Sequence, residues 1–503
     1  MPDLASKNNI ARGIDALRWN SVGTVISMLL QFAVGIILAR ELGPEPFGLI
    51  AIAWLILGLG NLIAEGGLGT ALIQKKEIDL VDIRESFTWQ IAVGLFLFMV
   101  MTFSADLICE WFRKPEAKNV VMSMALLFML QSFGMTSSAL LRRELRFKRL
   151  QVTKIISYLI GYVITGIPLA FLGYGVWSLV VAQLTQTGLF SLLCFFQIRH
   201  PVRPLVRLRD SGLLRFGFTV TGSNLTSWAI LNMDRFVIGR FFHTIQLGLY
   251  ERAFNLLATP MNAITSSIQA VLFAACSRHQ DDVAAIRLIY AGASITIGLL
   301  VFPPFFAVAA SSETVLIGIY GEQWRAAVPL VIPLALAMPI HALLAMCGPV
   351  LTALGFAKKE LLAQLFALTI IATILILASG TESIEIVTWS VFVAYILRFV
   401  FLVYPLCKVL SMNILIFLSL LLAPLSLAMI LASGIWILDR ELSSMGMDTV
   451  SRLFSNILVG GVFYIALMVL MRPLIVRGLM REALQAVDLQ LPRAVRTWAR
   501  IDL

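Results

Sequence analysis

The sequence predicts an all-α, polytopic membrane protein with about fourteen transmembrane helices, arranged as two six-helix lobes followed by two extra C-terminal helices. Three observations lead to this fold class. Hydrophobic residues make up 59% of the 503-residue chain and charged residues only 14%, which is too apolar for a soluble domain. Apolar stretches of about 20 residues recur along the whole chain. Short stretches containing Gly, Pro or polar residues separate them.

The apolar stretches define the predicted spans in chain order. Each is long enough to cross the hydrocarbon core of a bilayer, roughly 30 Å, as a helix. The predicted spans are residues 17–39, 47–72, 87–109, 119–140, 153–172, 174–196, 213–239, 247–275, 286–310, 326–352, 361–379, 384–407, 412–437 and 453–471. The polar start, MPDLASKNNIARGIDALRWN, lacks the small-residue cleavage site of a signal peptide, so we expect the first span to be retained.

The distribution of basic residues predicts the orientation of these spans. The formal net charge is +10, and most Lys and Arg residues between spans lie on one side if the N-terminus is cytoplasmic. The basic stretches LRRELRFKRL (141–150) and RHPVRPLVRLR (199–209) both lie on that side. They flank hydrophobic spans, so we expect anionic membrane lipids rather than nucleic acid as their partners. Both termini are therefore predicted to be cytoplasmic.

An internal repeat with an offset of 200 residues predicts the two lobes. The stretch ARELGPEPFGLIAIA (39–53) aligns with GRFFHTIQLGLYERA (239–253), and each ends one span and begins the next. The identical pairs are Arg40 and Arg240, Gly48 and Gly248, Leu49 and Leu249, and Ala53 and Ala253. An even number of spans separates the copies, so the lobes share one orientation, with a symmetry axis along the membrane normal. Two such lobes around a central cleft would suit alternating access.

The predicted domain boundaries follow from this repeat. The domains are an N-terminal lobe (1–198), a basic cytoplasmic linker (199–212), a C-terminal lobe (213–408), two further spans (409–472) and a cytoplasmic tail (473–503). As a helix, the end of the tail, LPRAVRTWARIDL, places apolar residues on one side and three arginines on the other. We expect the tail to lie on the cytoplasmic membrane surface.

Prolines interrupt the predicted span 326–352, which contains Pro329, Pro333, Pro339 and Pro349. Each removes a backbone hydrogen bond and favours a bend. The sequence leaves open whether these bends are fixed kinks or hinges.

Motifs for several chemistries are missing from the sequence. It contains no GxxxxGK[ST] phosphate loop, no HExxH and no GxSxG, and its five cysteines show no CxxC spacing. The Gly-rich stretch EGGLGTALIQ (65–74) is expected to end or pack a helix rather than bind phosphate. We therefore expect a protein that is not an enzyme and that carries no metal or cofactor.

Charged residues inside the predicted spans are the first candidate site residues. Asp234 and Arg235 lie near the outer end of one span, and Glu251 and Arg252 lie at nearly the same depth in the next. At a helix centre each such charge costs about 2.5–3.5 kcal/mol, so it normally faces water or a partner. Two interpretations remain open. Cross-hairpin ion pairs would join Asp234 to Arg252 and Arg235 to Glu251, or the four residues line the cleft.

The remaining charges suggest an anionic substrate. Arg398 lies near the middle of its span, and Arg40 and Arg240 lie at the outer ends of theirs. Arginines outnumber acids within the spans, so we expect a cationic cleft, in which guanidinium groups suit phosphate oxygens. The candidates for coupling transport to H+ or Na+ are Asp234, Glu251, His341 and Glu65. For His341, a hydrogen-bonded core histidine is the alternative.

Four stretches carry a resemblance to a known family: ARELGPEPFGLIAIA, GGLGTALIQKKEID, LRRELRFKR and NMDRFVIGRFFHTIQLGLYERAFNLLATP. They resemble the polysaccharide flippases of the multidrug/oligosaccharidyl-lipid/polysaccharide (MOP) superfamily, in particular the branch for O-antigen and colanic-acid-type exopolysaccharide. The resemblance covers nearly the whole chain. One departure is Ala274, where the family usually has proline.

The resemblance implies a function. It implies a two-lobed protein of the bacterial inner membrane that moves an undecaprenyl-diphosphate-linked oligosaccharide to the outer leaflet, driven by an ion gradient. Carried over onto matching positions, it implies roles for Asp234, Arg235, Arg240 and Arg252, whereas Arg398 rests on its charge. Polysaccharide synthesis enzymes are further candidate partners, through the tail. The alternative is an ion-coupled drug or metabolite antiporter of the same fold.

Overall fold

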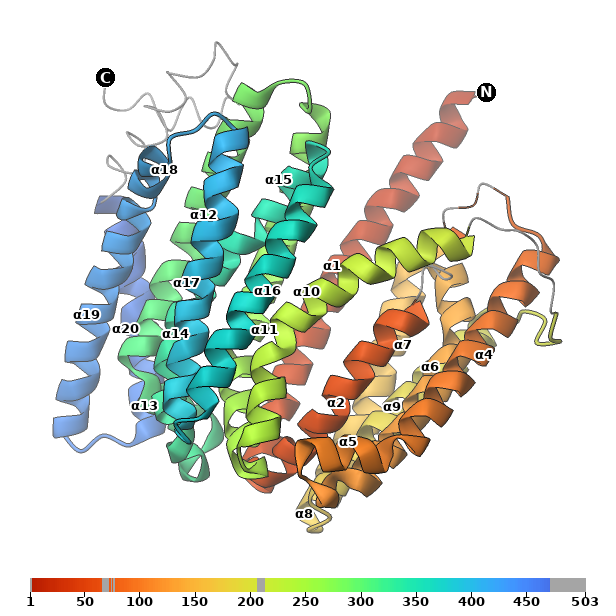
Figure 1. Ribbon diagram of the computed structural model, residues 1–503, viewed down its shortest axis with the longest axis horizontal. Coiled ribbons are helices and arrows are strands. Elements are labelled where there is room, and N and C mark those ends of the chain that lie inside the picture. The colour runs from red at the N-terminus through yellow and green to blue at the C-terminus, as the bar shows by residue number, and fades with distance from the viewer. Residues whose placement is uncertain (1, 66–71, 74, 76, 206–212, 471–503) are drawn as a thin grey trace. The chain divides into compact units, whose positions relative to one another are not determined.

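The computed structural model describes the backbone of residues 2–65, 72–73, 75, 77–205 and 213–470 (Figure 1). Within these ranges, the side chains of residues 2–17, 65, 213–224 and 357–361 lie outside the described part. The predicted tail (473–503) and the end of the basic linker (206–212) also lie outside the described residues.

The described residues confirm the all-α prediction. Their regular secondary structure is helical, and 13 helical segments are long and apolar enough to cross a membrane. The further predicted span, 213–239, corresponds to helix α10 (Leu213–Phe241). The chain is therefore a multi-pass membrane protein, and each predicted span has a helical counterpart.

The chain divides into two compact units, residues 1–251 and 252–503. The helices of the first unit include α1 (Pro2–Leu42), α2 (Pro44–Glu65), α4 (Leu80–Phe103), α5 (Ala105–Phe112), η1 (Pro115–Ala117), α6 (Lys118–Arg143), α7 (Phe147–Tyr158), η2 (Leu159–Gly166), α8 (Ile167–Phe171), α9 (Val176–Gln197) and α10. Helix α6 packs on both α4 and α9, which makes it the centre of this unit. Helix α10 packs on α2 and α5, although the repeat assigns it to the second lobe. The repeat-based domain boundaries stay a prediction.

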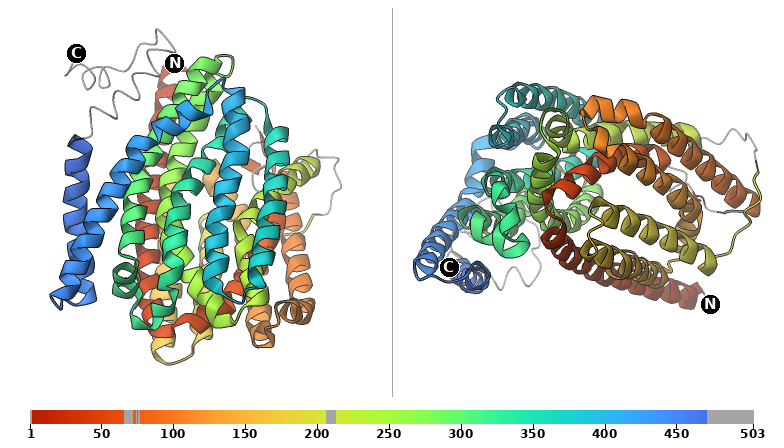
Figure 2. Two further views of the ribbon diagram at one scale, coloured as in Figure 1. Left: turned by 60° about the vertical axis from the view of Figure 1, so that its left-hand side comes forward. Right: turned by 90° about the horizontal axis from the view of Figure 1, so that it is seen from below.

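Helix α11 (Thr244–Arg278) begins in the first unit and continues into the second. The later helices are α12 (Val283–Ala310), α13 (Ser312–Tyr320), η3 (Glu322–Ala327), α14 (Val328–Ala345), α15 (Cys347–Ala353), α16 (Ala357–Ser379), α17 (Ile384–Val409), α18 (Ile414–Leu420), α19 (Leu422–Ser444) and α20 (Thr449–Leu470). Helix α14 packs on α12 and α17, and α12 also packs on α19. Helices α19 and α20, blue in Figure 2, pack on each other.

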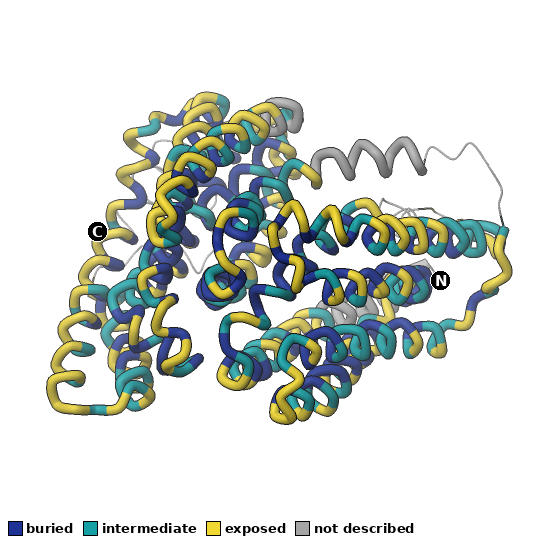
Figure 3. The backbone as a smooth tube through the Cα atoms, turned by 60° about the horizontal axis from the view of Figure 1, so that its bottom comes forward, coloured by how far each residue is buried: buried dark blue, intermediate teal, exposed yellow. Residues whose placement is uncertain are grey.

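Many of the described helices have a buried face and an exposed face, as the burial colours of Figure 3 show, whereas α14 is buried or half-buried almost all round. On α20, Phe454, Ile457 and Leu458 are each more than 60% exposed. The same helix buries Leu467 against α19 in a cluster with Leu431. In a chain of this composition the exposed apolar face is the surface that contacts lipid, because lipid does not penalise exposed hydrocarbon.

One predicted span is divided in the structure, and another is described only in part. Helix α2 is described as far as Glu65, and residues 66–71 of the predicted span 47–72 lie outside the described residues. The predicted span 87–109 is divided at Ser104 into α4 and α5. Helix α5 is amphipathic, because Ala105, Cys109 and Phe112 are buried on one side of it.

Prolines of α12 and α15 leave backbone carbonyls without their usual donor, and side chains of other helices satisfy these carbonyls. A proline at position i cannot donate to the carbonyl of residue i−4. For Pro349 that carbonyl belongs to Ala345, where α14 ends, and Gln269 of α11 donates its Nε2 to it at 2.6 Å. For Pro303 the carbonyl is that of Leu299, which accepts from the Tyr464 hydroxyl of α20 at 2.7 Å. The predicted span 326–352 is thus broken at Met346 into α14 and α15.

The predicted repeat appears as a reciprocal contact inside the first unit. A Cβ atom added to Gly48 of α2 would lie 1.9 Å from the Thr244 carbonyl oxygen. A Cβ added to Gly248 of α11 would lie 1.9 Å from the Pro44 carbonyl oxygen. The two contacts are equivalent under the repeat, because an offset of 200 residues relates Gly48 to Gly248 and Pro44 to Thr244. Such a reciprocal contact is the pattern of a local two-fold axis. Only glycine permits this approach of two helix backbones.

The start of the basic linker is fixed to the first unit. Arg84 of α4 donates its Nε to the Arg203 carbonyl at 3.1 Å, and the Leu205 amide donates to the Thr88 hydroxyl at 2.9 Å. The imidazole of His200 is buried, which lowers its pKa and keeps the ring neutral near pH 7. Residues up to 205 therefore belong structurally to the N-terminal helices.

Candidate functional site

The α10–α11 hairpin buries three of the predicted site residues in one polar network. Arg235 of α10 donates its Nε to Glu251 Oε2 of α11 at 2.5 Å, and their side chains are 12% and 9% exposed. Arg235 also donates to the Asn232 side-chain oxygen at 2.9 Å. Asp234 accepts from the Tyr250 hydroxyl and from the Arg235 amide. The structure thus contains one of the two cross-hairpin ion pairs considered above.

Helix geometry explains why these residues meet. Asp234 and Arg235 point roughly 100° apart on α10, so each requires a partner on another element. The chain reverses between Phe241 and Thr244, which brings Tyr250 and Glu251 of α11 to the same depth. Tyr250 was not among the predicted site residues. A phenol at the position before Glu251, facing an acid on the preceding helix, is the signal that sequence reasoning missed.

A second group of basic residues lies at the end of α10. The Arg240 guanidinium lies 5.8 Å from the centre of the Trp111 ring of α5, within range of a cation–π interaction. Burial lowers the pKa of the Lys114 ammonium, and the positive charge of Arg240 acts in the same direction. Arg40, at the last turn of α1, is exposed. The carboxylate of Glu116 acts against this shift in the Lys114 pKa, so acidic and basic groups lie together here, and the substrate-binding role of Arg40 and Arg240 stays a prediction.

The candidates of the second unit form two aromatic contacts. Arg252 of α11 lies over the Tyr320 ring at 5.8 Å. His341 of α14 stacks on Tyr395 of α17, with ring centres 5.1 Å apart. Arg398 follows Tyr395 by three residues on α17, one turn away on the same face. The structure therefore brings His341 and the segment that carries Arg398 together. The side chain of Glu65, the last residue of α2, lies outside the described residues.

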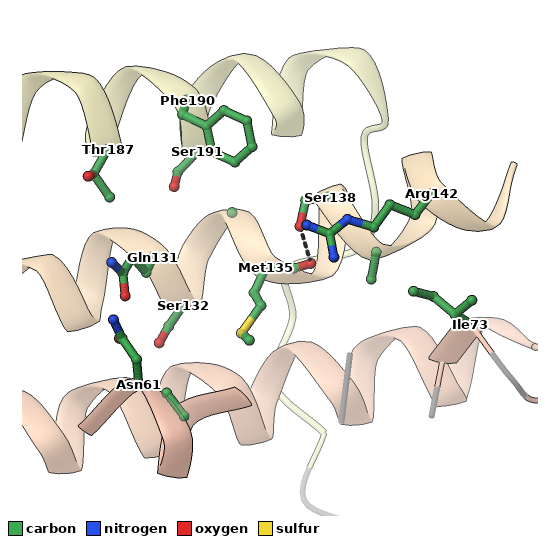
Figure 4. Close-up of a pocket in the computed structure, with 13 residues that line it drawn as sticks. Asn61, Ile73, Gln131, Ser132, Met135, Ser138, Arg142, Thr187, Phe190 and Ser191 are labelled. Atoms are coloured by element: carbon green, nitrogen blue, oxygen red, sulfur yellow. Dashed lines mark hydrogen bonds between the residues drawn. The ribbon is translucent and has the colours of Figure 1, made fainter. Parts of the chain in front are cut away.

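The first unit also contains a polar cavity that the sequence did not predict. Its volume is about 300 Å³, and it lies among the C-terminal halves of α2, α6 and α9; we call it the α2–α6–α9 cavity (Figure 4). The polar side chains that line it are Asn61, Gln131, Ser132, Ser138, Arg142, Thr187 and Ser191. The signal that sequence reasoning missed is the helical spacing of Gln131, Ser138 and Arg142, which places these polar side chains on one face of α6.

Comparisons with known proteins agree with this fold. A family model described as "Polysaccharide biosynthesis protein" matches residues 37–329, more than half of the chain. The teichuronic acid biosynthesis protein TuaB of Bacillus subtilis (strain 168) is 23% identical over 473 residues, covering 92% of this chain and 97% of TuaB. The succinoglycan biosynthesis transport protein ExoT of Rhizobium meliloti (strain 1021) is 28% identical over 337 residues, covering 66% of each chain.

A solved structure shows the same fold. The lipid II flippase MurJ, in an inward closed conformation, superposes with a TM-score of 0.74. It covers 91% of this chain and 99% of its own, with 17% sequence identity. At that identity the similarity is one of fold.

Proposed function

The chain belongs to the polysaccharide biosynthesis protein family, and from this premise we propose that it translocates an undecaprenyl-diphosphate-linked oligosaccharide across the bacterial cytoplasmic membrane. The transported molecule would supply exopolysaccharide or O-antigen export. The observation that carries the proposal is the family match on a multi-pass, all-helical chain. The names of ExoT, a transport protein, and MurJ, a lipid flippase, support the same function.

The mechanism we propose is alternating access. Repeats that contact each other about a local two-fold axis, at Gly48 and Gly248, provide a common point about which two similar halves can rock. We place both termini in the cytoplasm, because this orientation puts most Lys and Arg residues between spans inside. The protein would then act as a transporter and not as an enzyme.

The proposed substrate contacts are the arginines of the candidate site. Guanidinium groups bind phosphate oxygens through paired hydrogen bonds, so Arg40, Arg240, Arg252 and Arg398 are suited to a diphosphate. Arg235 is not among these proposed substrate contacts, because Glu251 already balances its charge. Asp234, Glu251, His341 and Glu65 are the proposed groups for coupling to H+ or Na+.

The test is substitution of arginines of the second unit. Arg252→Gln and Arg398→Gln should each reduce polysaccharide display in a strain that depends on this protein by about tenfold or more, since a charge-assisted hydrogen bond contributes about 1.5–3 kcal/mol. Arg440→Gln is the control, because Arg440 lies over Trp436 of α19, outside this group. Membrane levels of all variants are compared by immunoblot.

Normal display in both variants would contradict the proposed substrate contacts. Loss of display in all three would indicate a general defect in folding. Transport of labelled lipid-linked oligosaccharide, and not of cationic drugs, into vesicles that contain the purified protein would separate the flippase from the antiporter. Drug accumulation without lipid transport would overturn the proposed function.

A further inference from the structure

The α2–α6–α9 cavity has an exposed end and a buried end. Arg142, in the last turn of α6, is exposed and marks the first. Figure 4 shows its guanidinium lying back along α6 beside Ser138. Ser132 and Ser191, which are 3% and 2% exposed, line the buried end. A ligand can therefore place one group at the arginine and reach inward past uncharged polar side chains.

The cavity contains a buried hydrogen-bond acceptor that nothing in the described part of the chain satisfies. The Asn61 side-chain oxygen is buried and has no hydrogen-bond partner among the described residues. Asn61 and Gln131 point toward one another across the cavity in Figure 4. A buried polar atom without a partner costs about 1–3 kcal/mol, so it favours a ligand or water that donates a hydrogen bond. A hydroxyl group is such a donor.

The other lining groups indicate which chemical class of ligand fits the cavity. Arg142 is the one charged side chain among the described lining residues, so a ligand with a single anionic group matches the charge. Gln131, Ser132 and Thr187 offer donors and acceptors of the kind that sugar hydroxyls use. The volume of about 300 Å³ lies at the lower limit for small-molecule sites, roughly 300–1,000 Å³, which suits one sugar ring and its anion.

We propose that the α2–α6–α9 cavity is a binding site for a glycosyl phosphate: the phosphate contacts Arg142, and the sugar hydroxyls contact Asn61, Gln131 and Thr187. The residues that line this cavity do not include Arg240, Arg252 or Arg398. Two sources offer the same chemistry. One is a free sugar phosphate, and the other is the phosphate-linked sugar of a polyprenyl lipid.

The cavity also has a structural basis in close helix packing. A Cβ added to Gly134 of α6 would lie 2.4 Å from the Ser191 Oγ of α9. This glycine allows α6 and α9 to approach one another at the cavity wall. Ser191 in turn donates its hydroxyl to the Leu130 carbonyl at 2.6 Å, so its orientation is fixed. The buried end is therefore preformed by the packing of two helices.

Calorimetric titration of the purified full-length protein in detergent micelles tests the proposal. Glucose 1-phosphate should bind saturably, and more tightly than either glucose or inorganic phosphate, because each of these lacks half of the recognised groups. Arg142→Gln should weaken binding about tenfold or more, and Thr187→Val by a few-fold. Arg149→Gln is the matched control, since Arg149 is exposed on α7 and does not line the cavity.

A second arm identifies the source of the ligand. Polyprenyl-phosphoglucose is incorporated into nanodiscs with the protein and competed with glucose 1-phosphate. Competition that is lost in Arg142→Gln supports the lipid-linked headgroup as the ligand. Binding of glucose 1-phosphate alone, also lost in Arg142→Gln, supports the free sugar phosphate.

Two results would overturn the proposal. One is the absence of saturable binding for both probes to protein that elutes and melts as a folded species. The other is an equal loss of affinity in Arg142→Gln and Arg149→Gln, which would indicate a nonspecific effect of surface charge. Neither result bears on the proposed transport function, because that function is tested by Arg252 and Arg398 in the second unit.

Discussion

At the scale of single residues, the strongest feature is the ion pair between Arg235 and Glu251. Both side chains are largely buried, and transfer of two charges from water costs several kcal/mol per ion before their attraction is counted. The pair is extended by Asn232 on one side. Removing one partner therefore leaves an uncompensated charge among apolar helices, which is far worse than removing both.

We expect Arg235→Gln to destabilise the protein by about 3–5 kcal/mol, the usual cost of breaking a buried ion pair from one side. Thermal unfolding of the purified protein in detergent measures the effect. The exchanged variant, Arg235→Glu with Glu251→Arg, should regain much of the lost stability because opposite charges again face each other. If the single variant melts like the wild type, the pair does not hold the hairpin together.

The exchange also separates the two interpretations that the sequence left open. If the ion pair is structural, the exchanged variant should recover both stability and display of polysaccharide. If Arg235 contacts the substrate, the exchanged variant should recover stability but not display, because the guanidinium is then no longer on α10.

Sequence reasoning reached part of this residue-level detail. The pairing of Arg235 with Glu251 could be considered from the sequence, because a short turn between two helices places residues at the same depth opposite one another. The spacing of polar residues on α6 could have indicated one wall of the α2–α6–α9 cavity, but not the other walls, since Asn61 and Thr187 are ordinary polar residues in their own spans. Only the packing of three helices separated by about 60 to 70 residues along the chain makes them neighbours.

At the scale of helices, the proline bends show how an irregular backbone is tolerated in an apolar environment. The bilayer core offers no water to a freed carbonyl, so a neighbouring helix must supply the donor. Gln269 does this for Ala345, and Tyr464 does it for Leu299. The bends are thus tied to specific partners, which favours fixed kinks over free hinges at these two positions.

We expect Gln269→Leu to lower the stability of the protein by about 1–3 kcal/mol, because it leaves the Ala345 carbonyl without its donor. In a Pro349→Ala background the same substitution should cost much less, since the alanine introduced there has a backbone N–H that can donate to that carbonyl. Melting temperatures of the four proteins of this double-mutant cycle measure the coupling. Equal costs in both backgrounds would mean that the hydrogen bond does not compensate for the proline.

Hydropathy predicted the helices but not all of their ends. The break at Ser104 was missed because the segment ADLICEWF is apolar on average, so a running average continues through it. Its helical periodicity, with Ala105, Cys109 and Phe112 on one side, indicates a separate amphipathic helix.

At the scale of the whole molecule, the 200-residue repeat was the most informative prediction. Few identities support it in the sequence, yet two of the identical positions, Gly48 and Gly248, are where the repeats meet. Their identity is explained by sterics, since neither position has room for a Cβ atom. The division of the chain at residue 251 could not be predicted, because it depends on which helices α10 packs against.

We expect Gly48→Ala and Gly248→Ala to have similar effects, each costing about 1–3 kcal/mol and reducing polysaccharide display, because each Cβ would force apart the same two backbones. After one substitution has separated the helices, the second should cost less than the first. Gly292→Ala is the control, since nothing lies within 4 Å of its added Cβ, and alanine favours helix. Melting temperature and cell-surface polysaccharide are measured together. A tolerated Gly248→Ala beside a harmful Gly48→Ala would refute the local two-fold relation on which rocking of the repeats depends.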